Sequence, residues 1–561
     1  MDYKSQFAKC IADLLGEQLT EQQAYELIEV PKYASHGDFA FPCFTLAKTL
    51  RKSPVLIAEE LASKLHNPLF EKVEAKGAYL NVFLNKATVS KQVIETILQQ
   101  GNHYGDGSLG EGKTIVLDFS SPNIAKPFSM GHLRSTVIGN ALANIVEKCG
   151  YQAVRINHLG DWGTQFGKLI AAYKRWGDEN KIKENPIKEL FNLYVKFHEE
   201  AETNEQLERE GRAWFKKLED GDEEAHRLWQ WFRDESLKDF SRIYHLLGIS
   251  FDSYQGEAFY NDKMERVVHL LEERGLLSES DGAMVVRLDE KELPPCLIKK
   301  SDGATLYATR DLAAALYRHE TYEFSKALYV VGQEQSLHFN QVFSVLEKLG
   351  FDWAKMMVHV PFGLILKDGK KMSTRRGRVI LLEEVLQEAI SLAKQNITAK
   401  NPELENKEEV ARQVGVGAVI FHDLKNERTH NIEFSLEDML KFEGETGPYV
   451  QYTYARACSI LRNANTAATS EIKELTEESW EIVKLLASFP HVIQKAYKNL
   501  DPSLIAKYVI HLAQAFNSYY AHTKILVEDE GLNSRLALVH ATTVVLKEGL
   551  RLLGIGAPER M

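Results

Sequence analysis

The chain has 561 residues, a formal net charge of −11, and a composition that is 44% hydrophobic and 26% charged. These proportions exclude a mostly disordered chain, and at about 100–200 residues per domain the length predicts several domains. No apolar run approaches the roughly 18 residues of a membrane span, and the N-terminus is typical of an amphipathic helix, not of a signal peptide. We therefore expect a cytoplasmic protein with no membrane partner.

The cysteines and the distribution of charge limit the kinds of site to consider. The chain has five cysteines: Cys10, Cys43, Cys149, Cys296 and Cys458. They form no CxxC pair and none has zinc-ligand spacing to a histidine, so we expect reduced thiols and no metal site. The segment 367–378 holds six basic residues and one aspartate. A local basic segment predicts contact with an anion even in an acidic protein.

Residues 1–112 combine helical and strand patterns. An apolar run at 79–84 predicts a strand, and the pattern after it predicts a helix over about 87–100. The glycine-rich stretch 101–113 is typical of a domain boundary. We expect a small α+β domain followed by a linker.

Beyond Thr114, short β-branched runs alternate with helical patterns. Strands are expected at 114–120, 154–157 and 326–332, and helices over about 131–149, 164–176 and 336–348. This alternation predicts a multidomain α/β protein with a Rossmann-like parallel sheet over 113–380. The charged, Trp- and Glu-rich stretch at about 178–250 predicts a helical insertion. Helical patterns then predict a connector over 381–440 and an all-helical bundle over 441–561.

Two phosphate-binding patterns overlap in the glycine-rich stretch. GSLGEGKT (107–114) fits the P-loop pattern, and GDGSLG (105–110) fits the dinucleotide-binding pattern. Both motifs need a strand before the glycines and a helix after them, so that the helix N-terminus meets the phosphates. Here a helix precedes and a strand follows. We interpret the stretch as an interdomain turn and reject a conventional P-loop NTPase.

Two other segments have the chemistry of a nucleotide site. The loop 118–135 follows the first strand of the expected sheet, where ligands of open α/β sheets bind. In it Gly131 allows close backbone approach, and His132 can face a phosphate or ribose; the alternative is an ordinary loop with a capping histidine. The segment GKKMSTRRG (369–377) places lysines where they suit a pyrophosphate leaving group; the alternative is a solvated basic turn.

Together these segments resemble the two signatures of class I aminoacyl-tRNA synthetases. SPNIAKPFSMGHLRS (121–135) resembles the HIGH element, and KMSTR (371–375) resembles the KMSKS element. The surroundings resemble the arginyl-tRNA synthetase family over essentially the whole chain. The further matching segments are GAYLNVFLN (77–85), NHLGDWGTQFGKL (157–169), YATRDLAAALYR (307–318), VVGQEQSLHFNQ (330–341), DGKKMSTRRG (368–377), GETGPYVQYTYARACSILR (444–462) and GAPERM (556–561). Two positions depart from the pattern: Ser129 replaces the first His of HIGH, and Thr374 replaces the second Lys of KMSKS.

The resemblance implies the activation of L-arginine by ATP, then transfer to the terminal adenosine of tRNA(Arg). It implies Mg²⁺ on the ATP phosphates with no protein-only metal site, a monomer, and a need for tRNA in the first step. The catalytic positions it implies are Gly131, His132, Lys370, Lys371 and Ser373, with Lys370 or Lys371 supplying the charge missing at Thr374. The ATP-binding positions it implies are Ser129, Gly131, His132, His338, Gly363, Lys371 and Met372.

The resemblance also implies an arginine pocket. Its positions are Asp118, Asn123, His158, Tyr307, Asp311 and Gln335. A carboxylate accepts the planar guanidinium bidentately, which is the role that Asp311 matches; the alternative is a first-turn aspartate that favours the helix dipole. Asp118 and Asn123 match positions for the α-ammonium. Near His158, the residues Gly160, Asp161 and Gln165 are expected to border the cleft, or else to form a glycine turn packed around Trp162.

The family assigns the C-terminal bundle to the anticodon and the N-terminal domain to the tRNA elbow. Tyr449, Tyr452 and Arg456 have i, i+3, i+7 spacing, which suits stacking on bases and equally suits a core stripe. In the N-terminal domain, Asn81 and Phe83 are the expected contacts. Two alternatives stay open: a class I synthetase for another amino acid, and a catalytically silent tRNA-binding homologue.

Overall fold

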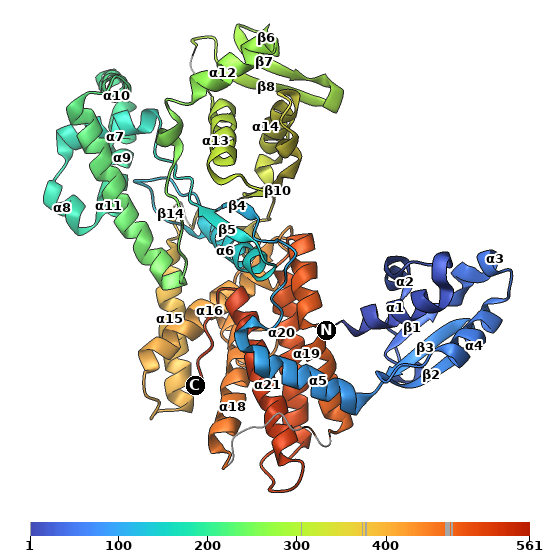
Figure 1. Cartoon of the computed structure of the whole chain (residues 1–561). Coiled ribbons are helices and arrows are strands. Elements are labelled where there is room, and N and C mark those ends of the chain that lie inside the picture. The colour runs from blue at the N-terminus through green and yellow to red at the C-terminus, as the bar shows by residue number, and fades with distance from the viewer. Residues whose placement is uncertain (1, 304–305, 373, 376–377, 466–471, 473–474) are drawn as a thin grey trace.

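The computed structural model describes residues 2–303, 306–372, 374–375, 378–465, 472 and 475–561. A small N-terminal domain lies apart from the rest of the molecule and joins it through the helix α5 (Lys86–Gln100) (Figure 1). This helix packs against α19 (Glu477–Asn499) and α21 (Leu532–Leu552) of the C-terminal bundle. None of the helices in the described part of the chain is long and apolar enough to span a membrane. All five cysteines are free thiols.

The N-terminal domain is built on a three-stranded antiparallel sheet. Its order is β1-β3-β2, and β3 covers the expected residues, 79–84. The elements are α1 (Tyr3–Leu15), α2 (Glu21–Leu27), β1 (Phe39–Pro42), α3 (Ala47–Leu50), α4 (Pro54–Lys64), β2 (Phe70–Lys76) and β3 (Tyr79–Leu84). Asp2 caps the first amides of α1, and Ser53 caps α4 ahead of its N-terminal proline.

The glycine-rich stretch after α5 is a turn, as predicted. Its amides bond the end of α6 (Leu133–Lys148): Gly107 N–H to the Lys148 carbonyl at 2.8 Å and Gly110 N–H to the Cys149 carbonyl at 2.9 Å. The strand β4 (Thr114–Asp118) follows. These amides therefore bond the protein's own carbonyls and do not cradle a phosphate.

The catalytic part is organised around a four-stranded parallel sheet of order β10-β9-β4-β5, which confirms the expected α/β class. Its other strands are β5 (Gln152–Ile156), β9 (Lys326–Val330) and β10 (Met357–Val360). Alternate residues of β4 face opposite sides: Ile115 and Leu117 join the core that includes α6 and the bundle, and Val116 joins the core of α13 (Tyr307–Tyr322) and α14 (Ser336–Lys348).

The expected insertion is helical. It comprises α8 (Glu179–Glu184), α9 (Pro186–Ala201), α10 (Glu205–Glu219) and α11 (Glu223–Leu247), and it packs against the separately expected helix α7 (Thr164–Trp176). A second excursion from the sheet holds α12 (Met264–Glu273) and an antiparallel sheet of β6 (Leu277–Ser280), β7 (Ala283–Leu288) and β8 (Leu293–Lys299). In Figure 1 this small sheet lies beyond α13 and α14, on the side of the parallel sheet away from the bundle.

Among the described residues after β10, helices predominate and the strands are short. The helices are α15 (Leu382–Lys400), α16 (Lys407–Leu424), α17 (Leu436–Met439), α18 (Gly447–Asn463), α19, α20 (Ser503–His522) and α21. The strands are β11 (Ile365–Lys367), β12 (Lys370–Lys371), β13 (Thr374–Arg375), β14 (Arg378–Val379) and β15 (Ile432–Glu433). β11 pairs with both β12 and β15, so the segment after α16 lies beside the basic hairpin.

Candidate active site

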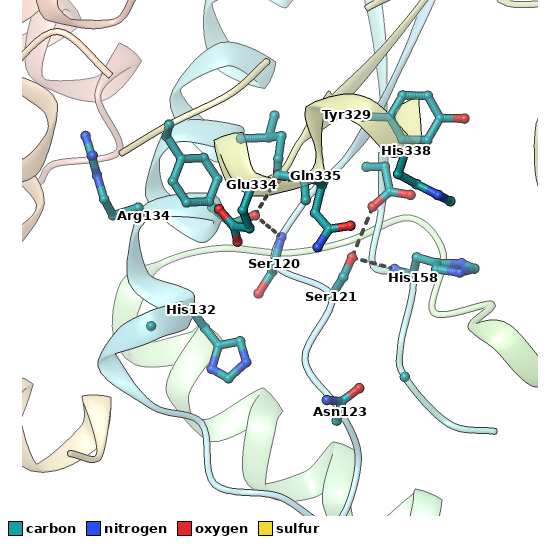
Figure 2. A pocket seen from close by; sticks show the side chains of 18 of the residues that line it. Ser120, Ser121, Asn123, His132, Arg134, His158, Tyr329, Glu334, Gln335 and His338 are labelled. Atoms are coloured by element: carbon teal, nitrogen blue, oxygen red, sulfur yellow. Dashed lines mark hydrogen bonds between the residues drawn. The ribbon is translucent and has the colours of Figure 1, made fainter. Parts of the chain in front are cut away.

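A cleft of about 850 Å³ opens at the carboxyl edge of the parallel sheet. Most of the predicted site residues line it: Asp118, Asn123, Ser129, Gly131, His132, His158, Gly160, Tyr307, Asp311, Gln335, His338, Gly363 and Lys371. Figure 2 shows His132, Asn123, His158 and Gln335 around it. Lys370, Met372, Asp161 and Gln165 are not among the lining residues, and Ser373 lies outside the described residues.

The loop after β4 has an unusual backbone. Ser120 and Ser121 have positive φ angles of 72° and 50°, a region that side chains other than glycine rarely adopt. Hydrogen bonds hold this geometry: the Ser120 amide donates to Ser135 Oγ at 2.9 Å, and the Ser121 amide donates to Asn157 Oδ1 at 3.1 Å. Ser120 Oγ also lies 2.7 Å from the hydroxyl of Tyr244, on the insertion helix α11. Strained backbone held by a network of this kind is typical of functional sites.

Asp118, at the end of β4, is paired with an arginine that sequence reasoning did not single out. Arg318 Nη1 donates to Asp118 Oδ2 at 2.8 Å, and the exposed fractions of the two side chains are 2% and 10%. Ser121 Oγ donates to the other carboxylate oxygen at 3.0 Å. Arg318 was visible only as the last letter of YATRDLAAALYR. The carboxylate is thus oriented before any substrate arrives.

Asp311 lies one turn into α13, and His338 Nε2 is 2.5 Å from its Oδ2 atom. Burial acts to raise the pKa of Asp311, but the His338 hydrogen bond and the nearby His158 and Arg318 hold it below its usual value. The position predicted to face adenosine therefore contacts the position predicted to bind the guanidinium. His338 and Asp311 line the same cleft.

A further carboxylate, Glu257, lines the same end of the cleft and was also missed. Burial raises its pKa to about 7. Arg310 lines the cleft beside it and donates to the Glu257 carbonyl and, at 2.8 Å, to Asn261 Oδ1. No sequence pattern marks Glu257, which begins a short 3-10 helix (Glu257–Tyr260) after the insertion.

Ser129, which replaces the first His of the HIGH element, caps the turn Met130–His132. Its Oγ accepts a hydrogen bond from the Gly131 amide at 3.2 Å, and its own amide donates to His132 Nδ1 at 3.1 Å. Because Nδ1 accepts, Nε2 carries the proton of the neutral ring. Burial lowers the pKa of His132 to about 4, so the ring is neutral near pH 7. The departure from the signature thus leaves an ordered turn at the start of α6.

The basic hairpin presents one of its two candidate lysines to the cleft. β11 and β12 form an antiparallel pair, with Lys370 opposite Lys367 and Lys371 opposite Leu366. Neighbouring side chains of a strand point to opposite faces, so only one of the pair can face the site. Lys371 lines the cleft, and Lys370 is exposed outside it.

Two glycines of the cleft have packing reasons for lacking a side chain. A Cβ at Gly160 would lie 1.8 Å from Asn123 Oδ1, because these residues form a parallel bridge. A Cβ at Gly363 would lie 2.7 Å from the His430 carbonyl oxygen and 2.7 Å from Asn431 Oδ1. Because Gly363 has no side chain, His430 and Asn431 of the segment after α16 can pack against it, and Gly363 also lines the cleft.

Three further predicted arginine contacts are open to solvent. Tyr307 is 71% exposed, and Asn123 and Gln335 are exposed at the cleft wall. Asp161, by contrast, is buried and accepts hydrogen bonds from Arg233 Nε and the Ala258 amide, both at 2.9 Å. It links the insertion to the sheet without lining the cleft.

A second groove, of about 1160 Å³, lies in the bundle between α18 and the end of α20. Tyr452 and Arg456 line it, with the Arg456 Cζ atom 5.0 Å from the Tyr452 ring centre and 4.8 Å from that of Tyr520. Tyr449 is not among its lining residues, and its hydroxyl accepts a hydrogen bond from Asn517 Nδ2 at 3.0 Å. Further basic residues on its walls are Arg462, Lys524 and Arg560.

The two N-terminal candidates differ in exposure. Asn81 is 3% exposed, and its amide group donates to the His36 carbonyl at 2.6 Å. Phe83 is half-buried, and Lys72 Nζ lies 4.9 Å from its ring centre. Asn81 therefore holds the loop before β1, and the Phe83 ring is the more accessible of the two.

Comparisons with known proteins cover the whole chain. Residues 1–84 match the arginyl tRNA synthetase N terminal domain, residues 93–436 the class I (R) tRNA synthetase catalytic domain, and residues 450–561 the DALR anticodon binding domain. The chain is 65% identical to arginine–tRNA ligase 2 of Bacillus anthracis, with 100% of both chains covered. Among solved structures, it superposes on the arginyl-tRNA synthetase of Thermus thermophilus with a TM-score of 0.84 at 26% identity, covering 100% of each chain. The Plasmodium falciparum arginyl-tRNA synthetase gives 0.82 at 25% identity, covering 100% of this chain and 98% of that one.

Proposed function

This chain belongs to the arginyl-tRNA synthetase family, and from that premise we propose how its cleft performs the family's reaction. The chain is an arginine–tRNA ligase: it uses ATP to activate L-arginine and attaches it to tRNA(Arg). The single observation that carries the assignment of roles below is that one cleft is lined both by the paired carboxylates Asp118 and Asp311 and by His132 and Lys371.

Arginine binds at the carboxylate end. Its guanidinium presents five N–H donors and needs acceptors, which Asp311, Glu257 and the hydroxyl of Tyr307 supply around that end of the cleft. Asp118 and Asn123 hold the α-ammonium, with the Asp118 carboxylate fixed in place by Arg318. A buried acceptor left without a partner costs about 1–3 kcal/mol or more, so citrulline and lysine bind poorly.

ATP binds at the other end. The Gly131 backbone and the N–H of the neutral His132 face the phosphates or ribose at the start of α6, and the Gly363 backbone borders the adenine side. ATP enters with Mg²⁺ on its phosphates, an ion that keeps several of its waters and needs no all-protein cage. Lys371 reaches the cleft from the exposed hairpin, where it can meet the pyrophosphate.

In the first step an oxygen of the arginine carboxylate attacks the α-phosphorus of ATP. The bond from that phosphorus to the bridging oxygen breaks, and pyrophosphate leaves with the electron pair. In the second step a hydroxyl of the terminal adenosine of tRNA attacks the carbonyl carbon and gives up its proton, the bond from that carbon to the phosphate oxygen breaks, and AMP leaves with the electron pair. The residues act mainly by positioning and by stabilising charge: Asp118 and Asp311 orient arginine, and Lys371 and the Nε2–H of His132 face the charge that develops on phosphate.

The tRNA is held by the two outer parts of the chain. The groove with Tyr452, Arg456 and Tyr520 offers stacking faces and positive charge to anticodon bases. Tyr449 supports that groove through Asn517, and the N-terminal domain meets the tRNA elbow through the Phe83 face. We place the domains at 1–112, 113–380, 381–440 and 441–561. We also expect the protein to be a cytoplasmic monomer.

ATP–pyrophosphate exchange with arginine, run with and without tRNA, tests this function. We expect exchange with arginine only when tRNA is present, and no exchange with lysine or citrulline. Exchange without tRNA would keep the enzyme but remove the requirement for RNA. Absence of exchange from folded protein in both reactions would favour a silent tRNA-binding protein, and exchange with another amino acid would favour a synthetase of different specificity.

A further inference from the structure

The ATP-facing wall of the cleft is a short irregular segment, 361–364, between β10 and β11. Phe362, Gly363 and Leu364 line the cleft, and Pro361 directly precedes them. The backbone here belongs to no strand, so its position depends on contacts from elsewhere in the chain. Within the sheet domain, the Gln333 amide donates to the Phe362 carbonyl at 3.2 Å.

Two contacts with the wall come from one arginine outside the sheet. Arg428, in the loop after α16, donates from Nη1 to the Pro361 carbonyl at 2.8 Å and from Nε to the Leu500 carbonyl at 2.9 Å. Its own carbonyl accepts a hydrogen bond from the Gly363 amide at 2.9 Å. One residue thus bonds the wall twice and bonds the bundle once.

The residues just after Arg428 complete a close-fitting support for the wall. Asn431 Oδ1 accepts a hydrogen bond from the Leu364 amide at 2.8 Å, and any side chain at Gly363 would collide with His430 and Asn431. The segment thus contacts the wall at Pro361, Gly363 and Leu364. A displacement of the segment therefore displaces the wall, because packed backbone has no room to absorb it.

Leu500 is the residue of the helical bundle whose carbonyl Arg428 contacts. It is the left-handed residue (φ 49°) that ends α19, and α20 starts at Ser503. The 20 residues of α20 extend about 30 Å at 1.5 Å per residue, and its last turns line the groove with Tyr452 and Arg456. Arg428 therefore joins the corner of the bundle to the wall of the catalytic cleft.

We propose that Arg428 is a positioning residue that fixes the ATP-facing wall 361–364 against the corner of the helical bundle, so that the affinity for ATP depends on it. It touches no substrate and acts through the backbone of Pro361 and Gly363. The guanidinium is suited to this because its planar fork reaches two carbonyls in different directions, which the single ammonium of lysine does not. The inference rests on the ATP side proposed above.

The test is ATP–pyrophosphate exchange of the full chain at saturating tRNA, with ATP and arginine each varied. Arg428→Met keeps the stem and removes both donors, and we expect the KM for ATP to rise about tenfold while the KM for arginine stays within about twofold. Arg428→Lys should fall between wild type and Arg428→Met. If Arg428→Met does not fold, the Arg428→Lys variant carries the same comparison.

A matched control is Arg412→Met. Arg412 lies on α16, pairs with Glu409 and donates to the Leu246 carbonyl of α11 at 3.5 Å, so it bonds the insertion and not the wall. Its removal should lower thermal stability without changing the KM for ATP.

Two outcomes overturn the proposal: equal rises in the KM values for ATP and arginine, or a fall in melting temperature with no change in the KM for ATP. Lys371→Ala distinguishes a failure of the role proposed for Arg428 from a failure of the assignment of ATP to this side of the cleft. If exchange falls with Lys371→Ala but the KM for ATP is unchanged in Arg428→Met, only the role of Arg428 fails. If neither variant alters exchange, the assignment of ATP to this side fails as well.

Discussion

On the arginine-facing side of the cleft the predicted carboxylates Asp118 and Asp311 are each paired with another side chain, whereas on the ATP-facing side the predicted residues His132 and Lys371 are neutral or exposed. Asp118 is bonded to Arg318, and Asp311 to His338. At the other end His132 is a neutral ring and Lys371 is an exposed lysine on a hairpin. The fold therefore supplies partners for the carboxylates on the arginine-facing side, but leaves Lys371 exposed on the ATP-facing side.

The difference follows from the two substrates. A buried carboxylate costs several kcal/mol unless it is paired, so a pocket for a cationic side chain has to be held by built-in partners until arginine arrives. Triphosphate brings its own charge and Mg²⁺, so the protein needs only close backbone approach, a neutral ring and an exposed cation to meet it. Removing groups from the first side should thus cost more than removing them from the second.

The largest effect should come from Asp311→Ala. We expect kcat/KM for arginine in the exchange reaction to fall about 10³-fold, because the guanidinium enclosed by the cleft would lose its carboxylate partner, a loss of about 3–5 kcal/mol for a desolvated pair, while the KM for ATP changes little. Glu320→Ala is the matched control: this carboxylate is on the same helix but pairs with Arg266 at the surface. Equal losses for arginine and ATP would remove the recognition role of Asp311.

Arg318→Met should destabilise the fold, because it leaves the Asp118 carboxylate buried without its cation. We expect the free energy of unfolding to fall by about 3 kcal/mol in urea titrations. The double variant with Asp118→Asn should recover part of that loss, since the uncompensated charge is gone. If single and double variants unfold alike, the pair contributes no such coupling.

His132 should make stability depend on pH. Its folded-state pKa of about 4 lies below the unfolded value near 6.5, so the unfolded chain binds the proton more readily. The stability is fully present above pH 6.5 and is lost as the pH falls towards 4, by about 3 kcal/mol in all. Unfolding measured from pH 7 to pH 4 should show a smaller decline in His132→Asn. Parallel declines in the two proteins would mean that His132 titrates normally.

The smallest of the four effects concerns the hairpin lysines. Lys371→Ala should lower the exchange rate about 10–100-fold, and Lys370→Ala should stay within about threefold, because only Lys371 lines the cleft. Lys370→Ala serves as the control, because it also removes one positive charge from the hairpin. A reversal of this order would show that the hairpin turns its other face to ATP.

Much of the local structure was predictable. The strand at 79–84 and the helices at 164–176 and 336–348 lie where periodicity places them, because helices and strands depend on neighbouring residues. The reversed order around GSLGEGKT also predicted correctly that this stretch is a turn. The family, too, was visible in the ordered motifs.

The partners within the site were not predictable. Arg318 is 200 residues from Asp118, Glu257 has no motif, and the left-handed backbone at Ser120 depends on Ser135 and Tyr244. In the sequence a buried arginine looks like any exposed one. Its role depends on which distant segment supplies the opposite charge.

The sequence by itself determined the elements, the order of the motifs and the kind of chemistry, because these are properties of residues close together along the chain. The tertiary structure alone decided that Ser129 caps the turn at His132, that Lys371 and not Lys370 enters the cleft, and that Arg428 supports its ATP-facing wall. Each of these outcomes depends on the packing of segments far apart in the chain, which no local pattern encodes.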